Sequence, residues 1–335
     1  MNPPDTLPLI SIGIPTYNRP DGLLRAVKSV RRQTCPRLEI LISDNASTDT
    51  TQEVCQRLAE SDNRIRYVRQ PKNLGPLLNF EFLLEQSAGT FFMWVADDDT
   101  LEPNVLERYV DFLESHPDHV MVAGVVRHFF SDQANPFMEE KGFTFTQEHP
   151  VKRISAFYRK VSAGAIFHGL MRRKIAAGIG LKKLMGADWI FISAMLMKGK
   201  IKQFDFPGYN KSLMGFSQNF EHYAATVGAS HFARRHPYLA LSWHASAQFL
   251  VDRQAYGSLS DFQRVRLFLL TFGSLTRMFT CHLIKAGPGN FLRSITRSAI
   301  KTLLPGSLLR WLHKWRTGAV PEPATDKGEE RPGTL

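Results

Sequence analysis

The sequence predicts an α/β fold, with a mostly parallel central sheet flanked by helices and a helical C-terminal region after it. Short apolar runs rich in β-branched residues alternate with segments whose apolar residues recur at helical spacing. The connections between them are short, as right-handed β-α-β units require. With 43% hydrophobic and 11% aromatic residues, the chain of 335 residues can bury such a core.

The first hundred residues carry the clearest alternation. Strands are predicted at 9–15, 38–43, 64–69 and 90–96. The helices between them are predicted at 21–34, 49–60 and 77–86, and Asp21 is the expected N-cap of the first. The fourth strand, TFFMWVA, is apolar throughout, which is typical of a central parallel strand. This order predicts a doubly wound, Rossmann-like sheet, whose ligand lies at the carboxyl ends of its strands.

The rest of the chain is less regular. Helices are predicted at 104–115 and 188–198, strands at 120–130, 165–171 and 199–205, and an irregular segment at 131–160. Residues 220–316 are mainly helical in pattern, and the Pro-, Glu- and Gly-rich tail is typical of disorder. The predicted domains are an α/β domain over 1–215, a helical basic region over 216–317 and a disordered tail over 318–335.

The net charge of +11 is concentrated in one segment. Residues 262–321 hold 10 basic residues and no acid, whereas residues 1–261 hold 30 basic and 27 acidic residues. A near-neutral α/β region argues against a nucleic-acid-binding protein. The three cysteines form no CxxC pair, which argues against a disulfide scaffold or a zinc knuckle and fits a reducing cytosol. We see no signal peptide and no uncharged apolar stretch of about 18 residues.

Polar clusters follow three of the predicted strands. They are the segments Thr16–Arg19, Asp44–Asn45 and Asp97–Asp99. Three adjacent aspartates raise one another's pKa unless a cation accompanies them, and hard oxygen ligands suit Mg²⁺ or Mn²⁺. The alternative is a solvated acidic turn that caps the next helix. Their position at the end of a buried strand favours the metal site.

Residues 9–205 resemble a family 2 glycosyltransferase, one of the inverting, nucleotide-sugar-dependent enzymes with the GT-A fold. The resemblance is carried by PTYNR at 15–19, SDNASTD at 43–49, NLG at 73–75 with Asn79, WVADDD-x-L-x-P at 94–103 and GADW at 186–189. Each piece is weak alone, but their order and spacing are specific. The resemblance implies that the nucleotide sugar is bound by Pro15, Thr16, Tyr17, Asn18, Asp44, Asn73, Gly75, Asn79, Asp97 and Asp98. The alternative for Asp44 is a helix cap, and Gly75 could equally form a turn.

The family's metal motif is usually written DxD, and this chain offers two alignments. Aligned on Pro103, Asp98 is the metal ligand, Asp97 contacts ribose or sugar and Asp99 supports; Ala96 then replaces a further acid. If Asp97-x-Asp99 is the motif, Asp99 binds the metal. The predicted cofactor is a divalent cation, Mn²⁺ or Mg²⁺, with Asp98 and Asp99 as the candidate ligands.

Inverting transfer needs a general base opposite the leaving diphosphate. Asp188 lies where the family carries its base, and no other acid occurs between Glu148 and Asp205. Asp188 can also act as the N-cap of the following helix. His168 and Trp189 are candidate acceptor or sugar contacts; the alternatives are a core or surface histidine and a helix-core tryptophan.

The C-terminal segment has the pattern of basic amphipathic helices. Apolar residues of 291–303 share one face, and Trp311 and Trp315 belong to a second stripe beside basic residues. Such helices lie on anionic membranes, so residues 264–316 are predicted to bind an anionic membrane surface. Packing against the α/β domain is the main alternative, and nucleic-acid binding is disfavoured.

The predicted function is inverting transfer of a hexosyl or deoxyhexosyl group from a nucleoside-diphosphate sugar, UDP- or dTDP-sugar favoured. The expected acceptor is a hydroxyl of a glycan, lipid-linked, in cell-surface polysaccharide synthesis. The expected location is cytoplasmic, peripheral on the inner face of the plasma membrane. The alternatives are a nucleotidyltransferase acting on sugar phosphates, for which PTYNRPDG is a poor phosphate loop, and a non-catalytic nucleotide-sugar-binding scaffold.

Overall fold

A computed structural model describes residues 10–35, 37–130, 135–161, 165–213, 224, 227 and 229–285. The chain divides into two compact units, Met1–Met278 and Phe279–Leu335. The first unit contains the whole sheet and all of the candidate site residues.

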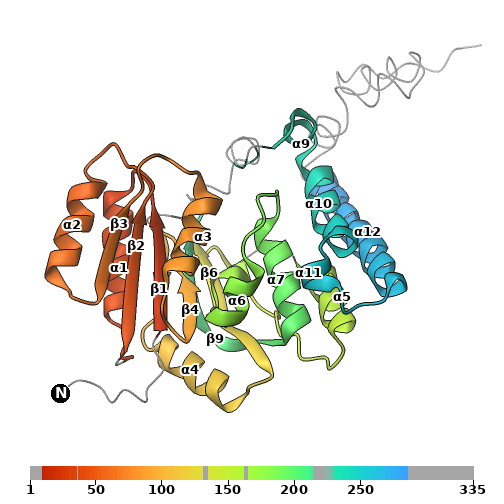
Figure 1. The fold of residues 1–335 in the computed structure, drawn as a ribbon, viewed down its shortest axis with the longest axis horizontal. Coiled ribbons are helices and arrows are strands. Elements are labelled where there is room, and N and C mark those ends of the chain that lie inside the picture. The colour runs from red at the N-terminus through yellow and green to blue at the C-terminus, as the bar shows by residue number, and fades with distance from the viewer. Residues whose placement is uncertain are drawn as a thin grey trace, which may run out of the picture. The chain divides into compact units, whose positions relative to one another are not determined.

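The described strands of this unit form one nine-stranded sheet at its centre (Figure 1). Its strands are β1 (Ile10–Thr16), β2 (Leu38–Asp44), β3 (Ile65–Arg69), β4 (Phe91–Trp94), β5 (Thr100–Leu101), β6 (His119–Phe129), β7 (Met138–Glu140), β8 (Leu170–Arg172) and β9 (Lys200–Ser212). The order is β3-β2-β1-β4-β8-β6-β9-β5, with β7 beside β6.

The two halves of the sheet differ in strand direction. β3, β2, β1 and β4 are all parallel, and Thr16 at the end of β1 pairs with Asp44 at the end of β2. β8 runs antiparallel to both β4 and β6, whereas β6 and β9 are parallel. The predicted α/β sheet is confirmed, with its parallel strands in the N-terminal half and mixed directions beyond β4.

Helices cover both faces of the sheet. They are α1 (Pro20–Arg31), α2 (Thr51–Ser61), α3 (Pro76–Gln86), α4 (Val105–Ser115), α5 (Pro150–Lys160), α6 (Arg173–Ile179), α7 (Ala187–Lys198), α9 (His231–Arg235), α10 (Pro237–Val251), α11 (Arg253–Tyr256) and α12 (Asp261–Lys285). α1, α2 and α4 share one core with Ile12 and Ile14 of β1. α3 lies on the opposite face, where a Cβ on Gly13 would come within 3.0 Å of Leu83 Cβ.

An aromatic cluster joins β4 to α7. The Trp94 ring stacks on Phe167 at 4.6 Å between centroids and meets Phe191 of α7 edge-on at 5.5 Å. Trp94 Nε1 also donates a hydrogen bond of 2.9 Å to the carbonyl of Phe80. Because these rings are buried, they fix the position of α7 relative to the strand that precedes the three aspartates.

The prediction of an irregular segment at 131–160 is wrong at 138–140 and at 150–160, where the structure has a strand and a helix. α5 begins at Pro150, whose missing N–H suits the first position of a helix, and His149 Nδ1 accepts a hydrogen bond of 3.2 Å from Val151 N. The side chains of Ile154, Phe157 and Tyr158 on this helix are buried. The short strand β7 also lies in this segment and pairs with β6.

Three further local predictions need correction. Residues 165–168 form a 3₁₀ turn, η1 (Ala165–His168), and only Leu170–Arg172 continue as a strand. Asp21 is not the N-cap of α1, because Arg19 holds that position and Pro20 begins the helix. Asp188 is likewise not the cap of α7: Gly186 is, with a φ of 78° that favours glycine.

The C-terminal part of the first unit is helical, as predicted, from α9 to α12. Within the described residues, no helix is long and apolar enough to cross a membrane. The predicted domain boundary at residue 215, the amphipathic stripes of 291–316 and the tail 318–335 lie outside the described residues.

Candidate active site

The loops after β1 and β2 are tied together by hydrogen bonds. Asn18 has a φ of 52°, its backbone N–H donates to Ser47 Oγ at 2.9 Å, and its Oδ1 accepts from Thr48 N at 2.8 Å. Tyr17, the residue before it, is exposed. The left-handed backbone at Asn18 turns the chain from Pro15 and Thr16 toward α1, and the amide secures that turn on the neighbouring loop.

Asp44 lies at the end of β2 with no exposed surface. Its carboxylate accepts hydrogen bonds from Ser47 N at 2.8 Å, Tyr67 Oη at 3.2 Å and Arg69 Nη1 at 2.7 Å. Arg69 Nη2 also donates to the carbonyl of Ser47. The sequence analysis missed Tyr67 and Arg69 as partners, because nothing near them in the chain marks them and only the β2–β3 pairing brings them to Asp44.

Asn73, Gly75 and Asn79 reach the same edge through the β3–α3 connection. Asn73 Oδ1 accepts from Asn45 Nδ2 at 3.0 Å, and Gly75 has a φ of 81°. Asn79 is buried; its amide nitrogen donates to the carbonyl of Ser43 at 3.0 Å and its Oδ1 accepts from Ser43 Oγ. These contacts hold the loop onto β2.

The three aspartates after β4 have three different environments. Asp97 is buried and accepts from Thr16 Oγ1 at 2.8 Å and Tyr17 N at 3.3 Å. Asp98 is paired with the guanidinium of Arg19. Asp99 is buried and accepts from Tyr209 Oη at 2.8 Å and Ser212 N at 2.7 Å. The run therefore connects the β1 loop on one side to β9 on the other.

Burial is the main cause of the pKa shifts of Asp97 and Asp99. Loss of hydration, with the charge of Asp98, raises the pKa of Asp97 to about 7. The same two causes raise the pKa of Asp99. Close packing keeps the loop in place, since a Cβ on Gly22 of α1 would lie 2.5 Å from the carbonyl oxygen of Asp97.

Asp188 lies in the first turn of α7, half-buried. Loss of hydration raises its pKa, and the positive charge of Lys211 opposes that rise. The same ammonium acts on Asp99 and His168. Lys211, on β9, is a further residue that the sequence analysis missed. Its positive charge acts on Asp99, a predicted metal ligand, and on Asp188, the predicted base.

His168 and Trp189 are both buried. His168 Nδ1 lies 3.1 Å from Tyr209 Oη and 3.3 Å from the carbonyl of Trp94, and burial lowers the pKa of the imidazole to about 3. The ring stacks on Tyr209 at 4.7 Å. The neutral histidine therefore positions the tyrosine that bonds Asp99. Trp189 is only 6% exposed, which favours the helix-core alternative.

Asp98 is the aspartate of the run best suited to a divalent cation. The guanidinium of Arg19 pairs with Asp98 and also lies 3.8 Å from Asp97 Oδ1, but the carboxylates of Asp97 and Asp99 are in addition held by hydroxyl and backbone donors. Within the described ranges, no group of three His, Cys, Asp or Glu side chains could hold a metal alone. One or two carboxylates completed by a substrate diphosphate and water is the common arrangement for Mg²⁺, so the donor set fits.

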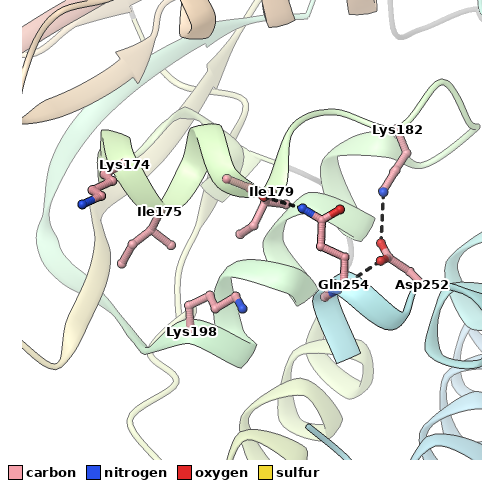
Figure 2. Close-up of a pocket in the computed structure, with 9 residues that line it drawn as sticks. Lys174, Ile175, Ile179, Lys182, Lys198, Asp252 and Gln254 are labelled. Atoms are coloured by element: carbon pink, nitrogen blue, oxygen red, sulfur yellow. Dashed lines mark hydrogen bonds and ion pairs between the residues drawn. The ribbon is translucent and has the colours of Figure 1, made fainter. Parts of the chain in front are cut away.

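A separate cavity of about 260 Å³ lies at the other end of α7 (Figure 2). It is bordered by α6, the last residue of α7 and α11, and Lys182 forms an ion pair of 3.1 Å with Asp252 at its edge. None of the predicted site residues lines it. The candidate site is therefore the sheet edge, where Thr16, Asp44 and Asp97 meet.

Comparisons with known proteins agree with this arrangement. The model of glycosyl transferase family 2 matches residues 11–178. The GalNAc(5)-diNAcBac-PP-undecaprenol β-1,3-glucosyltransferase of Campylobacter jejuni is 40% identical over 96 residues, which are 28% of this chain and 31% of that protein. The chain thus matches about a third of that relative's length.

Solved structures share the fold at low identity. The complex of residues 1–349 of TarS from S. aureus with UDP-GlcNAc has a TM-score of 0.61 at 14% identity, covering 93% of this chain and 88% of that one. The mannosyltransferase PcManGT from Pyrobaculum calidifontis, in complex with GDP-Man and Mn²⁺, has a TM-score of 0.50 at 14% identity, covering 95% and 85%. The predicted GT-A fold is confirmed.

Proposed function

This chain belongs to glycosyl transferase family 2, and we propose that it transfers a sugar from a nucleoside-diphosphate sugar to a hydroxyl group of an acceptor glycan. The observation that carries the proposal is the junction of three strand ends. Thr16, Asp44 and Asp97 lie at neighbouring carboxyl ends of β1, β2 and β4, with direct hydrogen bonds from the β1 loop to the acid run. In open α/β sheets, this edge is where nucleotides bind.

The donor is bound by the N-terminal half of this edge. Exposed Tyr17 offers a ring face to the base, and Asp44 offers a carboxylate to a pyrimidine N–H once its hydrogen bond from Tyr67 is exchanged. The surrounding loops are shaped by Pro15, Asn18, Asn73, Gly75 and Asn79. A UDP- or dTDP-sugar is the favoured donor, and the UDP-GlcNAc complex of TarS supports this class of ligand.

A divalent cation, Mn²⁺ or Mg²⁺, accompanies the donor. Asp98 is its proposed ligand, with Asp99 as the second carboxylate, and Mn²⁺ in the PcManGT complex supports such a cofactor. When bound, the ion neutralises the leaving diphosphate. In the protein without donor, the guanidinium of Arg19 balances the charge of Asp98. When the cation takes over that role, the guanidinium can bind a phosphate oxygen of the donor.

Asp188 is the proposed general base of an inverting displacement. It accepts the proton of the acceptor hydroxyl while that oxygen forms its bond to the anomeric carbon and the bond to the nucleoside diphosphate breaks. Its raised pKa makes the carboxylate a better proton acceptor, and the charge of Lys211 opposes part of that rise. His168 and Tyr209 hold Asp99 in position.

The proposed acceptor is a lipid-linked glycan of cell-surface polysaccharide synthesis. The support is the name of the Campylobacter jejuni relative, whose substrate carries an undecaprenol diphosphate. Such an acceptor places the reaction at a membrane, and we assign the chain to the inner face of the plasma membrane, attached through residues 264–316.

Thermal stabilisation by nucleotide sugars tests the donor site. We expect one of the UDP-, dTDP- or GDP-sugars to raise the melting temperature, and Mn²⁺ to enlarge the rise, because a ligand that binds only the folded state stabilises it by RT ln(1 + [L]/Kd). Asp98→Ala should abolish the Mn²⁺ effect, while Asp111→Ala, an exposed acid of α4, should retain it. Mn²⁺ dependence that survives Asp98→Ala would refute the assignment.

A further inference from the structure

Helices α10 and α12 expose an unusual amount of apolar surface. Of the large hydrophobic side chains that the described residues expose, most belong to α9–α12. We call six of those on α10 and α12 the apolar face. Its members are Leu239, Trp243 and Leu250 of α10 and Phe262, Val265 and Leu269 of α12.

The spacing of these residues makes one continuous surface. Leu239, Trp243 and Leu250 are separated by four and seven residues, and Phe262, Val265 and Leu269 by three and four, so each set lies on one side of its helix. Trp243 meets Phe268 at 5.7 Å and Phe272 at 6.4 Å, so the two helices lie side by side at this surface (Figure 1).

Basic side chains border the apolar face, and acidic side chains are few beside it. Arg266 and Arg277 are exposed on α12, about 40° to 60° around the helix from Phe262 at 100° per residue. No acid occurs between Phe262 and Lys285. Asp261, which precedes this stretch, is already paired with Arg253 and Arg264.

We propose that the apolar face is a docking surface for an anionic lipid bilayer. Exposed aliphatic and aromatic groups enter the interface between headgroups and acyl chains, Trp243 lies at the polar boundary, and the flanking arginines meet lipid phosphates. A second copy of the chain is a poorer occupant, because a two-fold contact would bring the same arginines of both copies together.

This inference rests on the proposed function, because a membrane surface is the partner that would present a lipid-linked acceptor to the enzyme. It differs from the predicted attachment through residues 264–316 in including α10. Vesicle binding does not depend on transfer, so the two proposals fail separately: transfer to a water-soluble acceptor tests the reaction, and binding to lipid tests the surface.

Flotation of the full chain with vesicles of phosphatidylglycerol and phosphatidylethanolamine is the test. Phe262→Ser combined with Leu269→Ser should weaken partitioning by about tenfold or more, because two exposed apolar groups no longer enter the lipid. Phe137→Ser combined with Leu24→Ser is the matched control: Phe137 is 65% exposed against 76% for Phe262, and it should leave partitioning unchanged.

The charges are tested in the same assay. Arg266→Gln combined with Arg277→Gln should weaken binding roughly tenfold or more, and Arg25→Gln combined with Arg57→Gln, exposed arginines of α1 and α2, should change it little. Equal effects of the test and control pairs would overturn the proposal, as would equal binding to uncharged vesicles. A stable dimer in solution that Leu269→Ser dissociates would assign the face to a second copy instead.

Discussion

The two halves of the central sheet hold their polar side chains in different ways. Beside β1–β4, the side chains proposed to bind the donor also bond to one another and to their neighbours: Thr16 to Asp97, Asn18 to Thr48, and Asp44 to Arg69. Beside β6–β9 and α7, hydrogen bonds hold Tyr209 and His168, whereas the half-buried Asp188 is influenced by a backbone hydrogen bond from Trp189 and by the charge of Lys211. The side chains of the donor half therefore bond to one another, while we propose that the Asp188 carboxylate meets an incoming hydroxyl.

Asp188→Asn should show the difference between the two halves of the sheet most clearly, because it should reduce catalysis without weakening donor binding. We expect kcat to fall by roughly 10² to 10⁴, the range for loss of a general base, with donor affinity unchanged. Burial raises the pKa of the Asp188 carboxyl, so the folded state holds its proton more tightly and this group costs stability above the folded pKa. The free energy of unfolding of the variant at pH 7 should therefore equal or exceed that of the parent.

Steady-state kinetics and urea unfolding provide the measurements for Asp188→Asn. The matched control is Asp205→Asn, which removes an exposed acid of β9 and should leave kcat unchanged. Retained transfer in Asp188→Asn would show that another group accepts the proton.

Asp44→Ala should have the opposite profile, with stability as its main loss. The substitution leaves Arg69 and two further donors without their buried acceptor, at a cost of about 2–3 kcal/mol in the free energy of unfolding. Urea unfolding monitored by circular dichroism would measure it. Glu60→Ala, which removes an exposed acid of α2, serves as the control. An unchanged urea midpoint would mean that the donor half is not stabilised by the Asp44 carboxylate.

Lys211→Gln should lower kcat roughly tenfold, because its positive charge no longer opposes the charges of Asp99 and Asp188. Without that charge, the pKa of Asp188 rises further, so the acidic limb of the pH–rate profile should move to higher pH. Lys211→Arg keeps the positive charge, so it should restore much of kcat and return the acidic limb of the profile toward its original pH. A pH profile that Lys211→Gln leaves in place would show that the ammonium does not act on the base.

The smallest expected effect lies in the donor half, at Asp62. Ion pairs with Arg64 at 2.8 Å and Arg31 at 2.9 Å lower the pKa of its carboxyl to about 2. This stabilisation is complete above the unfolded pKa near 3.9 and is lost as the pH falls toward 2. Since both arginines are partly exposed, the gain is less than about 1 kcal/mol. Asp62→Asn should flatten the pH dependence of urea unfolding between about pH 5 and 3; an unaltered slope would contradict it.

The sequence predicted the donor half better than the acceptor half for a physical reason. β1, β2 and β4 are buried apolar runs that end in polar residues, so their positions and their function are both visible locally. Tyr209 and Lys211 belong to β9, a long strand of mixed burial, and they reach Asp99 and Asp188 through the pairing of β9 with β5 and β6. Long-range pairing of this kind leaves no mark near the residues it brings together.

The stacked rings around Trp94 have a consequence for the conditions under which the protein can work. They set the spacing between the acid run and the helix that carries Asp188 by contact between uncharged surfaces. Such contacts respond little to ionic strength or acidity, unlike the Arg19–Asp98 pair. Changes in salt should therefore alter how strongly charged ligands bind, while the distance across which the reaction takes place stays the same.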